Sequence, residues 1–223
     1  MLLFQPETTE DAIGVIKELF AKAKEHHDAT GEDALITIIL DSAAGAPTRG
    51  EMAAGLGAEG QKAGGHAGLY SQAMRQIVRG IASTRIALII INQEKEKLSF
   101  TGFARGDSTK TMIAANPLNF HSSMILTTHR IQIIKDSKKV PQGIVTRVRV
   151  KKNKNAAPFS EADVTIWFDD RGVDDAASIL AMAVAINIIE KDRAWYVYEC
   201  DDGDIRKFQA ASFKNVLEEL PEI

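Results

Sequence analysis

The chain has 223 residues, of which 45% are hydrophobic and 26% are charged, and its net charge is −3. This composition is that of an ordinary globular protein with a sizeable core. The single cysteine, Cys200, excludes an intramolecular disulfide framework and fits a reducing compartment. No signal peptide is visible, and the longest apolar run, residues 179–189, is too short to cross a bilayer. We therefore expect a cytoplasmic protein without a membrane partner.

The small net charge hides an uneven distribution. Residues 94–155 contain 13 Lys and Arg against 4 Asp and Glu, whereas residues 160–223 contain 6 against 15. A basic middle followed by an acidic tail favours a polyanionic partner and a competing acidic segment. The alternative is that these charges only solvate the surface.

The chain opens with a predicted strand and a predicted helix. Met1–Gln5 is a short apolar run that ends at a proline, which is consistent with a strand. Thr8 and Asp11 then have the spacing of a capping box, and apolar residues follow at helical spacing. The pattern predicts an amphipathic helix over about residues 8–26.

Two nearly continuous apolar runs come next, Ala34–Leu40 and Ile86–Ile91. Such runs are typical of central parallel strands that are covered on both faces. Asp41 follows the first run and Gln93 follows the second. Because α/β folds bind ligands at the carboxyl ends of their strands, both side chains are candidates for a ligand site.

Two segments lack sustained periodicity. Residues 43–68 contain eight glycines, which make regular structure costly, and a helix is predicted after them over Leu69–Ile81. Residues 94–118 interleave cations with aromatic side chains: Lys95, Lys97, Phe100, Phe103, Arg105 and Lys110. Cations beside aromatic rings suit single-stranded nucleic acid, through phosphate contacts and base stacking.

No phosphate-binding loop is found in the chain. Gly106–Thr111 superficially suggests one, but three residues separate its glycine from Lys110. The lysine of a P-loop directly follows the last glycine, so that its amine and the backbone amides reach the same phosphates.

The last third contains three strand-like runs and then a small acidic module. The runs are Met124–Ile134, Ile144–Lys151 and Ala162–Phe168, and the second carries Arg147, Arg149 and Lys151 on one face. Residues 169–175 are predicted to be the boundary before a small C-terminal domain. After them we expect a helix at about 175–191, a strand at 195–198 and a helix at about 208–219.

Four blocks, in this order along the chain, resemble RecA-type DNA recombinases: Gln5–Thr8, Leu35–Ser42, Ser71–Gln93 and Lys152–Phe159. The resemblance implies an α/β protein with a RecA-like ATPase core, a central mixed, largely parallel sheet flanked by helices. It implies this core over residues 1–172, truncated at its N-terminus, and a small acidic α+β domain over residues 173–223. The family's P-loop and catalytic glutamate would precede Met1.

The resemblance also implies roles for individual residues. Asp41 would be the Walker B carboxylate that orders Mg²⁺ through water, and Gln93 would sense the terminal phosphate of ATP. Lys152 and Lys154 would reach a neighbouring subunit's nucleotide, with Ser42 and Pro158 as further nucleotide contacts. Phe120 would lie on the relay between a DNA-binding loop and the filament interface. Residues 43–68 and 94–118 would be the two DNA-binding loops, with contacts from Arg49, Lys62, His66, Lys95, Lys97, Phe100, Phe103, Arg105 and Lys110.

Three functions follow from these observations. The first is a recombinase segment that binds ATP and single-stranded DNA within a filament, completed by other protein, in recombination and DNA repair. The second is a non-catalytic modulator that docks on an intact recombinase. The third is an unrelated α/β interaction domain, which leaves the match at Lys152–Phe159 unexplained.

Overall fold

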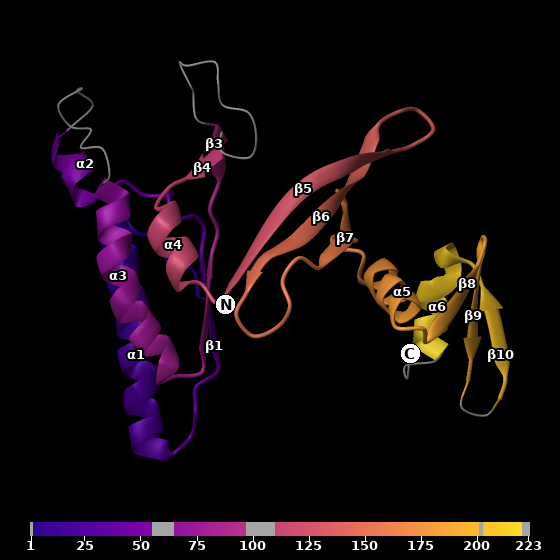
Figure 1. The fold of residues 1–223 in the computed structure, drawn as a ribbon, viewed down its shortest axis with the longest axis horizontal. Helices are drawn as coiled ribbons and strands as arrows, with labels where there is room; N and C mark the ends of the chain where they lie inside the picture. The colour runs from indigo at the N-terminus through magenta and orange to yellow at the C-terminus, as the bar shows by residue number, and fades with distance from the viewer. Residues whose placement is uncertain (1, 55–64, 97–109, 201–202, 220–223) are drawn as a thin grey trace. The chain divides into compact units, whose positions relative to one another are not determined.

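The computed structural model describes residues 2–54, 65–96, 110–200 and 203–219 (Figure 1). The chain divides into two compact units, Met1–Ser122 and Ser123–Ile223. The first unit contains helices α1 to α4 and strands β1 to β4, and the second contains strands β5 to β10 with helices α5 and α6. Both units combine helices with small sheets in the described residues, so the chain is a mixed α/β protein.

Helix α1 (Thr9–Thr30) begins where the capping-box pattern predicts it. The Thr8 hydroxyl accepts a hydrogen bond from the backbone N–H of Asp11 at 3.2 Å, and the Asp11 carboxylate accepts one from the Thr8 N–H at 3.2 Å. The helix continues past residue 26 and ends at Gly31, whose φ of 74° is the left-handed conformation that glycine adopts at little cost. The predicted helix is confirmed, with a later end.

The two apolar runs form strands β1 (Ile36–Leu40) and β2 (Ile86–Ile90), which pair in parallel. One face packs against α1 and α3 through Ile36, Ile38, Leu40, Leu88 and Ile90. On the other face Ile39 is 62% exposed and Ile89 is 50% exposed. The prediction that both faces are covered is wrong for the described part of the chain, because α1 and α3 direct their apolar side chains to the same face.

The sheets are smaller than the single central sheet that the resemblance implies. Among the described strands, β1 and β2 form the one parallel pair. The remaining sheets, β3–β4, β5–β6–β7 and β8–β9–β10, are antiparallel. Strands joined by short turns pair antiparallel, whereas parallel neighbours need a long crossover such as the one through α3.

Short regular elements interrupt both segments that were predicted to be irregular. The first segment contains α2 (Arg49–Ala54) and the start of α3 (Gly65–Ala82). The second contains β3 (Glu94–Glu96), β4 (Lys110–Met112) and most of α4 (Ala115–His121).

The strand predicted at Met1–Gln5 is not formed by residues 2–5. Leu2 is 92% exposed and Leu3 is 88% exposed. A strand needs a hydrogen-bonding neighbour, and none of the described segments pairs with these residues.

Helices α1 and α3 approach closely at Gly80, where a Cβ would lie 2.7 Å from Cδ2 of Phe20. Phe20 is 6% exposed, so its ring has little room to move. Although alanine is favoured in helices by about 1 kcal/mol over glycine, overpacking costs about 1–3 kcal/mol. We expect Gly80→Ala to lower the free energy of unfolding in urea by about 1 kcal/mol, the difference between these effects.

Gly68 is the matched control, because it lies in the same helix and a Cβ there would meet no atom within 4 Å. Gly68→Ala should be neutral or stabilising by up to about 1 kcal/mol. Equal unfolding free energies for the two variants would contradict the close packing of α1 on α3.

The second unit begins with an antiparallel meander of β5 (Met124–Lys135), β6 (Pro141–Asn153) and β7 (Glu161–Trp167), which confirms the three predicted strands. It continues with α5 (Asp175–Ala185), β8 (Ile189–Asp192), β9 (Trp195–Glu199), β10 (Ile205–Phe208), a 3₁₀ turn at Ala210–Ser212 and α6 (Phe213–Glu219). Buried side chains of these later elements form a core of their own, which includes Leu180, Ile189, Tyr198, Phe208 and Phe213.

The junction between β7 and α5 is closely hydrogen-bonded. The Trp167 N–H donates to the Gly172 carbonyl at 2.7 Å, the Asp174 N–H donates to the Thr165 carbonyl at 2.9 Å, and the Trp167 indole donates to the Asp174 carboxylate at 3.1 Å. The domain boundary at residues 172 and 173 stays a prediction.

Candidate functional site

The carboxyl ends of β1 and β2 meet at one edge of the first unit, because the strands are parallel. Two backbone hydrogen bonds extend their pairing beyond the strands, from the Ile91 N–H to the Leu40 carbonyl at 3.0 Å and from the Ala43 N–H to the Ile91 carbonyl at 2.9 Å. The segments that carry Asp41 and Gln93 are therefore held beside each other, and both residues are exposed.

Oxygen donors suited to a hard cation occur at this edge. Asp41 supplies an exposed carboxylate, and Ser42, joined to it by a cis peptide bond, supplies a hydroxyl. Among the described residues no group of three or more His, Cys, Asp and Glu could hold a metal ion. The donor set fits Mg²⁺ bound through one carboxylate and water, since Mg²⁺ keeps much of its hydration shell.

Asn92 connects the end of β2 to the far end of the second predicted loop. Its side-chain amide donates to the carbonyl of Ile113 at 2.8 Å, and its Oδ1 accepts from the N–H of Gln93 at 3.0 Å. Sequence reasoning assigned a role to Gln93 at this strand end and none to Asn92. The contact positions Gln93 relative to the chain that leads into α4.

Tyr70 of α3 fixes the turn that follows Asp41, and sequence reasoning missed it. The residue is 1% exposed, and its hydroxyl donates to the carbonyl of Ala43 at 2.9 Å. Burial raises the pKa of Tyr70 to about 12, so the hydroxyl keeps its proton. The signal was present, because residue 70 shares a helical face with the apolar residues Ala73, Met74 and Ile77, which are buried in α3.

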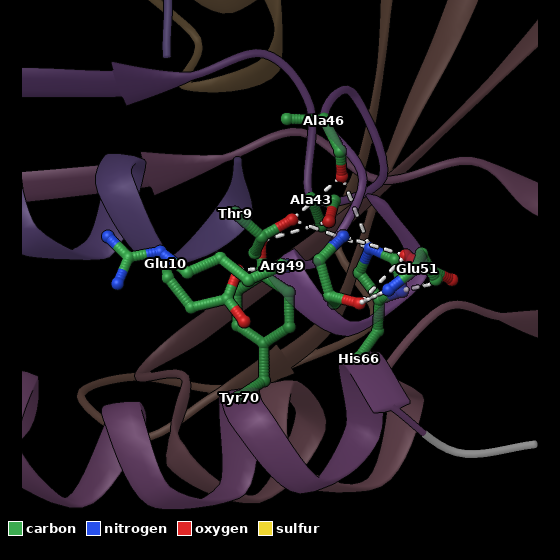
Figure 2. Close-up of polar contacts among 9 residues, drawn as sticks. Thr9, Glu10, Ala43, Ala46, Arg49, Glu51, His66 and Tyr70 are labelled. Atoms are coloured by element: carbon green, nitrogen blue, oxygen red, sulfur yellow. Dashed lines mark hydrogen bonds and ion pairs between the residues drawn. The ribbon is translucent and has the colours of Figure 1, made fainter. Parts of the chain in front are cut away.

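The remainder of this turn is anchored to α1 and α2 (Figure 2). The Thr9 N–H donates to the Pro47 carbonyl at 2.9 Å, and the Thr9 hydroxyl donates to the Ala46 carbonyl at 2.7 Å. Glu51 of α2 accepts from the N–H of Thr48 at 2.7 Å, and this hydrogen bond is the largest cause that lowers the Glu51 pKa. Thr48 and Glu51 form a second capping box, a sequence signal for α2 that was overlooked.

Two of the predicted DNA contacts have protein partners. Arg49 is exposed, but its guanidinium lies 2.6 Å from the Asp11 carboxylate, and this hydrogen bond raises the Arg49 pKa. The Asp11 pKa is lowered, chiefly by the Thr8 hydroxyl. His66 is held by residues of α1, α2 and the turn, with its side chain 16% exposed.

The other predicted DNA contacts fall in or beside the gaps of the structure. The backbones of Lys95 and Lys110 belong to the β3–β4 pair, in which Glu96 lies opposite Lys110. Lys62, Lys97, Phe100, Phe103 and Arg105 lie outside the described residues.

The basic face predicted on β6 is partly neutralised by its neighbouring strand. Arg147 donates two hydrogen bonds to Asp163 of β7, at 2.8 and 3.0 Å, and this pairing lowers the Asp163 pKa. The Arg149 guanidinium lies 3.2 Å from the Glu161 carboxylate. Such cross-strand partners depend on register and are not readable from one strand alone.

The predicted interface residues are divided between the two units. Lys152 ends the basic stretch of β6 and is half-buried, Lys154 and Pro158 are exposed, and the Lys154 N–H donates to the Ser123 carbonyl at 2.9 Å. Phe120, in α4 of the first unit, is 75% exposed, and its ring meets that of His121 edge to face.

None of the helices in the described residues has the length and apolar character needed to cross a membrane.

Comparison with known proteins gives a consistent result. The sequence model of the RecA N-terminal domain matches residues 1–174. The chain is similar to proteins named Protein RecA from Salinispora arenicola, with 34% identity over 227 residues, and from Thermus thermophilus, with 33% identity over 225 residues. Each alignment covers 100% of this chain but only 58% and 60% of the respective relative. The chain therefore spans about 60% of the length of these relatives.

Proposed function

The chain belongs to the RecA family, and on this premise we propose that it binds single-stranded DNA and contributes part of an ATP site to a recombinase filament. In this role it would act in the cytoplasm, in homologous recombination and DNA repair. The nucleotide's phosphate cradle would come from residues other than these 223, because their sequence contains no P-loop.

The observation that carries this proposal is the pairing of the strand ends. Asp41 and Gln93 lie on neighbouring segments that backbone hydrogen bonds hold together. Asp41 would hold Mg²⁺ through water, and Gln93 would contact the terminal phosphate of ATP. Bound Mg²⁺ would supply charge neutralisation for the phosphates.

The same strand end offers a path between nucleotide and DNA. Asn92 contacts both Gln93 and the carbonyl of Ile113, which lies in the last part of the segment that we propose binds DNA, residues 94–118. A shift of Gln93 toward or away from a phosphate would therefore move a residue that is bonded to the far end of that segment.

Lys152 and Lys154 would act on the nucleotide of a neighbouring subunit. Cations placed there would stabilise the negative charge that develops during phosphoryl transfer, as an arginine finger does. Neither lysine could stabilise charge on a neighbour's nucleotide in an isolated chain, so the proposal requires an assembly.

The exposed outer face of β1 and β2 supports the need for an assembly. Ile39, Ile89 and Ile91 are 62%, 50% and 41% exposed, and Leu35 is 83% exposed. Neighbouring apolar side chains left in water are costly, and they are typical of surfaces that another element covers.

Photo-cross-linking tests the DNA-binding part of the proposal. Oligothymidylate carrying 5-iodouracil should cross-link to peptides from residues 94–118, which contain Phe100 and Phe103, because stacked aromatic rings react with the halogenated base. Phe103→Leu should reduce the yield. The matched control is Phe168→Leu, which removes a ring that is 60% exposed in the second unit and should leave the yield unchanged. Cross-links confined to other segments would contradict the assignment of residues 94–118 as a DNA-binding loop.

The non-catalytic modulator is a second candidate, favoured by the same exposed face and by the lack of a P-loop within these 223 residues. It would dock on an intact recombinase through Lys152 and Lys154 and would bind no DNA by itself. Co-elution with the Thermus thermophilus Protein RecA in size-exclusion chromatography, together with the absence of DNA binding by the chain alone, would favour this candidate.

A further inference from the structure

The imidazole ring of His66 lies where four segments of the first unit converge (Figure 2). His66 is in the first turn of α3. Its Nδ1 is 3.5 Å from Oε1 of Glu51 in α2, and its Nε2 is 3.3 Å from the carbonyl of Ala46 and 3.4 Å from the hydroxyl of Thr9 in α1.

Every group that faces the ring accepts hydrogen bonds. The Thr9 hydroxyl gives its own hydrogen to the Ala46 carbonyl at 2.7 Å, so toward His66 it can only accept. The Ala46 carbonyl and the Glu51 carboxylate are acceptors as well. A neutral imidazole has one N–H and can serve only one side of the ring, whereas an imidazolium donates on both sides.

The hydrogen bond from Thr48 keeps Glu51 available as an acceptor. The hydrogen bond from the Thr48 N–H lowers the Glu51 pKa from its ordinary value of 4.5. The stabilisation contributed by the ionised Glu51 is therefore fully present above pH 4.5. It is lost only as the pH falls through the lowered pKa, below the range in which histidine titrates. The other charged groups on the facing helices have different partners: the Arg49 guanidinium donates to the Asp11 carboxylate, and the Glu10 carboxylate accepts from the backbone N–H of Arg49.

A catalytic role for this hydroxyl, imidazole and carboxylate does not fit the geometry. The order Thr9, His66, Glu51 resembles a nucleophile, base and acid. However, Thr9 is 3% exposed and its hydrogen points to Ala46, so its oxygen is neither activated by the ring nor accessible to a substrate.

We propose that His66 is a proton-controlled clasp, which when protonated ties α2 and the turn after Asp41 to α1 and α3. When the ring loses a proton, either the bond to Glu51 or the bonds to Ala46 and Thr9 lose their donor. Helix α2 is then held to α3 by fewer contacts. This device needs neither DNA nor nucleotide and stands independently of the proposed function.

Distance measurements between α2 and α3 test the clasp. Spin labels are placed at Met52→Cys and Gln72→Cys, both exposed positions, in a Cys200→Ser background. The width of the distance distribution is compared at about pH 5.5 and about pH 8.5, which bracket the ordinary titration of histidine. At the lower pH we expect a narrow peak of distances, and we expect the fraction of molecules in that peak to fall severalfold at the higher pH.

Three variants separate the clasp from other effects of pH. His66→Gln should give a broad distribution at both pH values, and Glu51→Gln should lose most of the pH response while keeping a side chain of the same shape. His27→Gln, at the far end of α1, should respond as the parent does. The proposal is overturned if the parent distribution does not change with pH, or if His66→Gln responds as the parent does.

Discussion

Single-stranded DNA is expected to dissociate from the purified chain as the salt concentration rises. Six cations were predicted to contact DNA, and one of them, Arg49, is paired with Asp11. About five neutralised phosphates give a slope of log K against log salt near −3.5, or a loss of about a hundredfold in affinity between 50 and 200 mM salt. Fluorescence anisotropy of a labelled oligothymidylate measures this slope.

Three variants separate the charge contacts from the stacking contacts. Lys97→Gln should make the slope shallower by about 0.7, the contribution of one phosphate on a single strand. Phe103→Leu should weaken binding by about 1–3 kcal/mol at every salt concentration and leave the slope unchanged. The guanidinium of Arg147 is already paired with Asp163, so Arg147→Gln should change neither the slope nor the affinity. An affinity that is indifferent to salt would count against this mode of binding.

The purified chain is expected not to hydrolyse ATP, with or without DNA. Its Asp41 and Gln93 can order a metal and contact a phosphate, but the 223 residues contain no P-loop backbone to hold the β- and γ-phosphates. Removing even one preorganised donor from an oxyanion site costs about a hundredfold to a thousandfold in rate. With the whole cradle absent, phosphate release should equal that of a protein-free control.

A contaminating ATPase would imitate a contrary result, so the decisive variant is Asp41→Asn. DNA-stimulated turnover that this substitution abolishes would belong to the chain and would refute the prediction. Turnover that persists in the variant would come from another protein in the preparation.

Local patterns predicted the elements that depend on neighbouring residues. The capping box of Thr8 and Asp11 predicted the start of α1, and continuous apolar runs predicted β1 and β2. The same kind of pattern, at Thr48 and Glu51, could have predicted α2 but was overlooked among the many glycines around it. The same apolar runs placed Asp41 and Gln93 at strand ends, where the structure has them.

Features that depend on distant segments could not be predicted. The exposed face of β1 depends on where α1 and α3 pack, which the apolar run itself does not specify. The pairing of Arg147 with Asp163 depends on the register of β6 with β7. The contacts of His66 join four segments, and a lone histidine in a glycine-rich stretch carries no sign of them.

The central claim is that this chain supplies one part of an ATP site and that residues other than these 223 supply the phosphate cradle. DNA-stimulated ATP turnover in a reconstituted mixture tests it most directly. The chain is mixed with the part of the Thermus thermophilus Protein RecA that lies outside the region it matches. We predict turnover only when both polypeptides and DNA are present, with its loss when Lys152→Ala and Lys154→Ala are combined. Turnover by this chain alone, or turnover in the mixture that does not depend on these two lysines, would contradict the account.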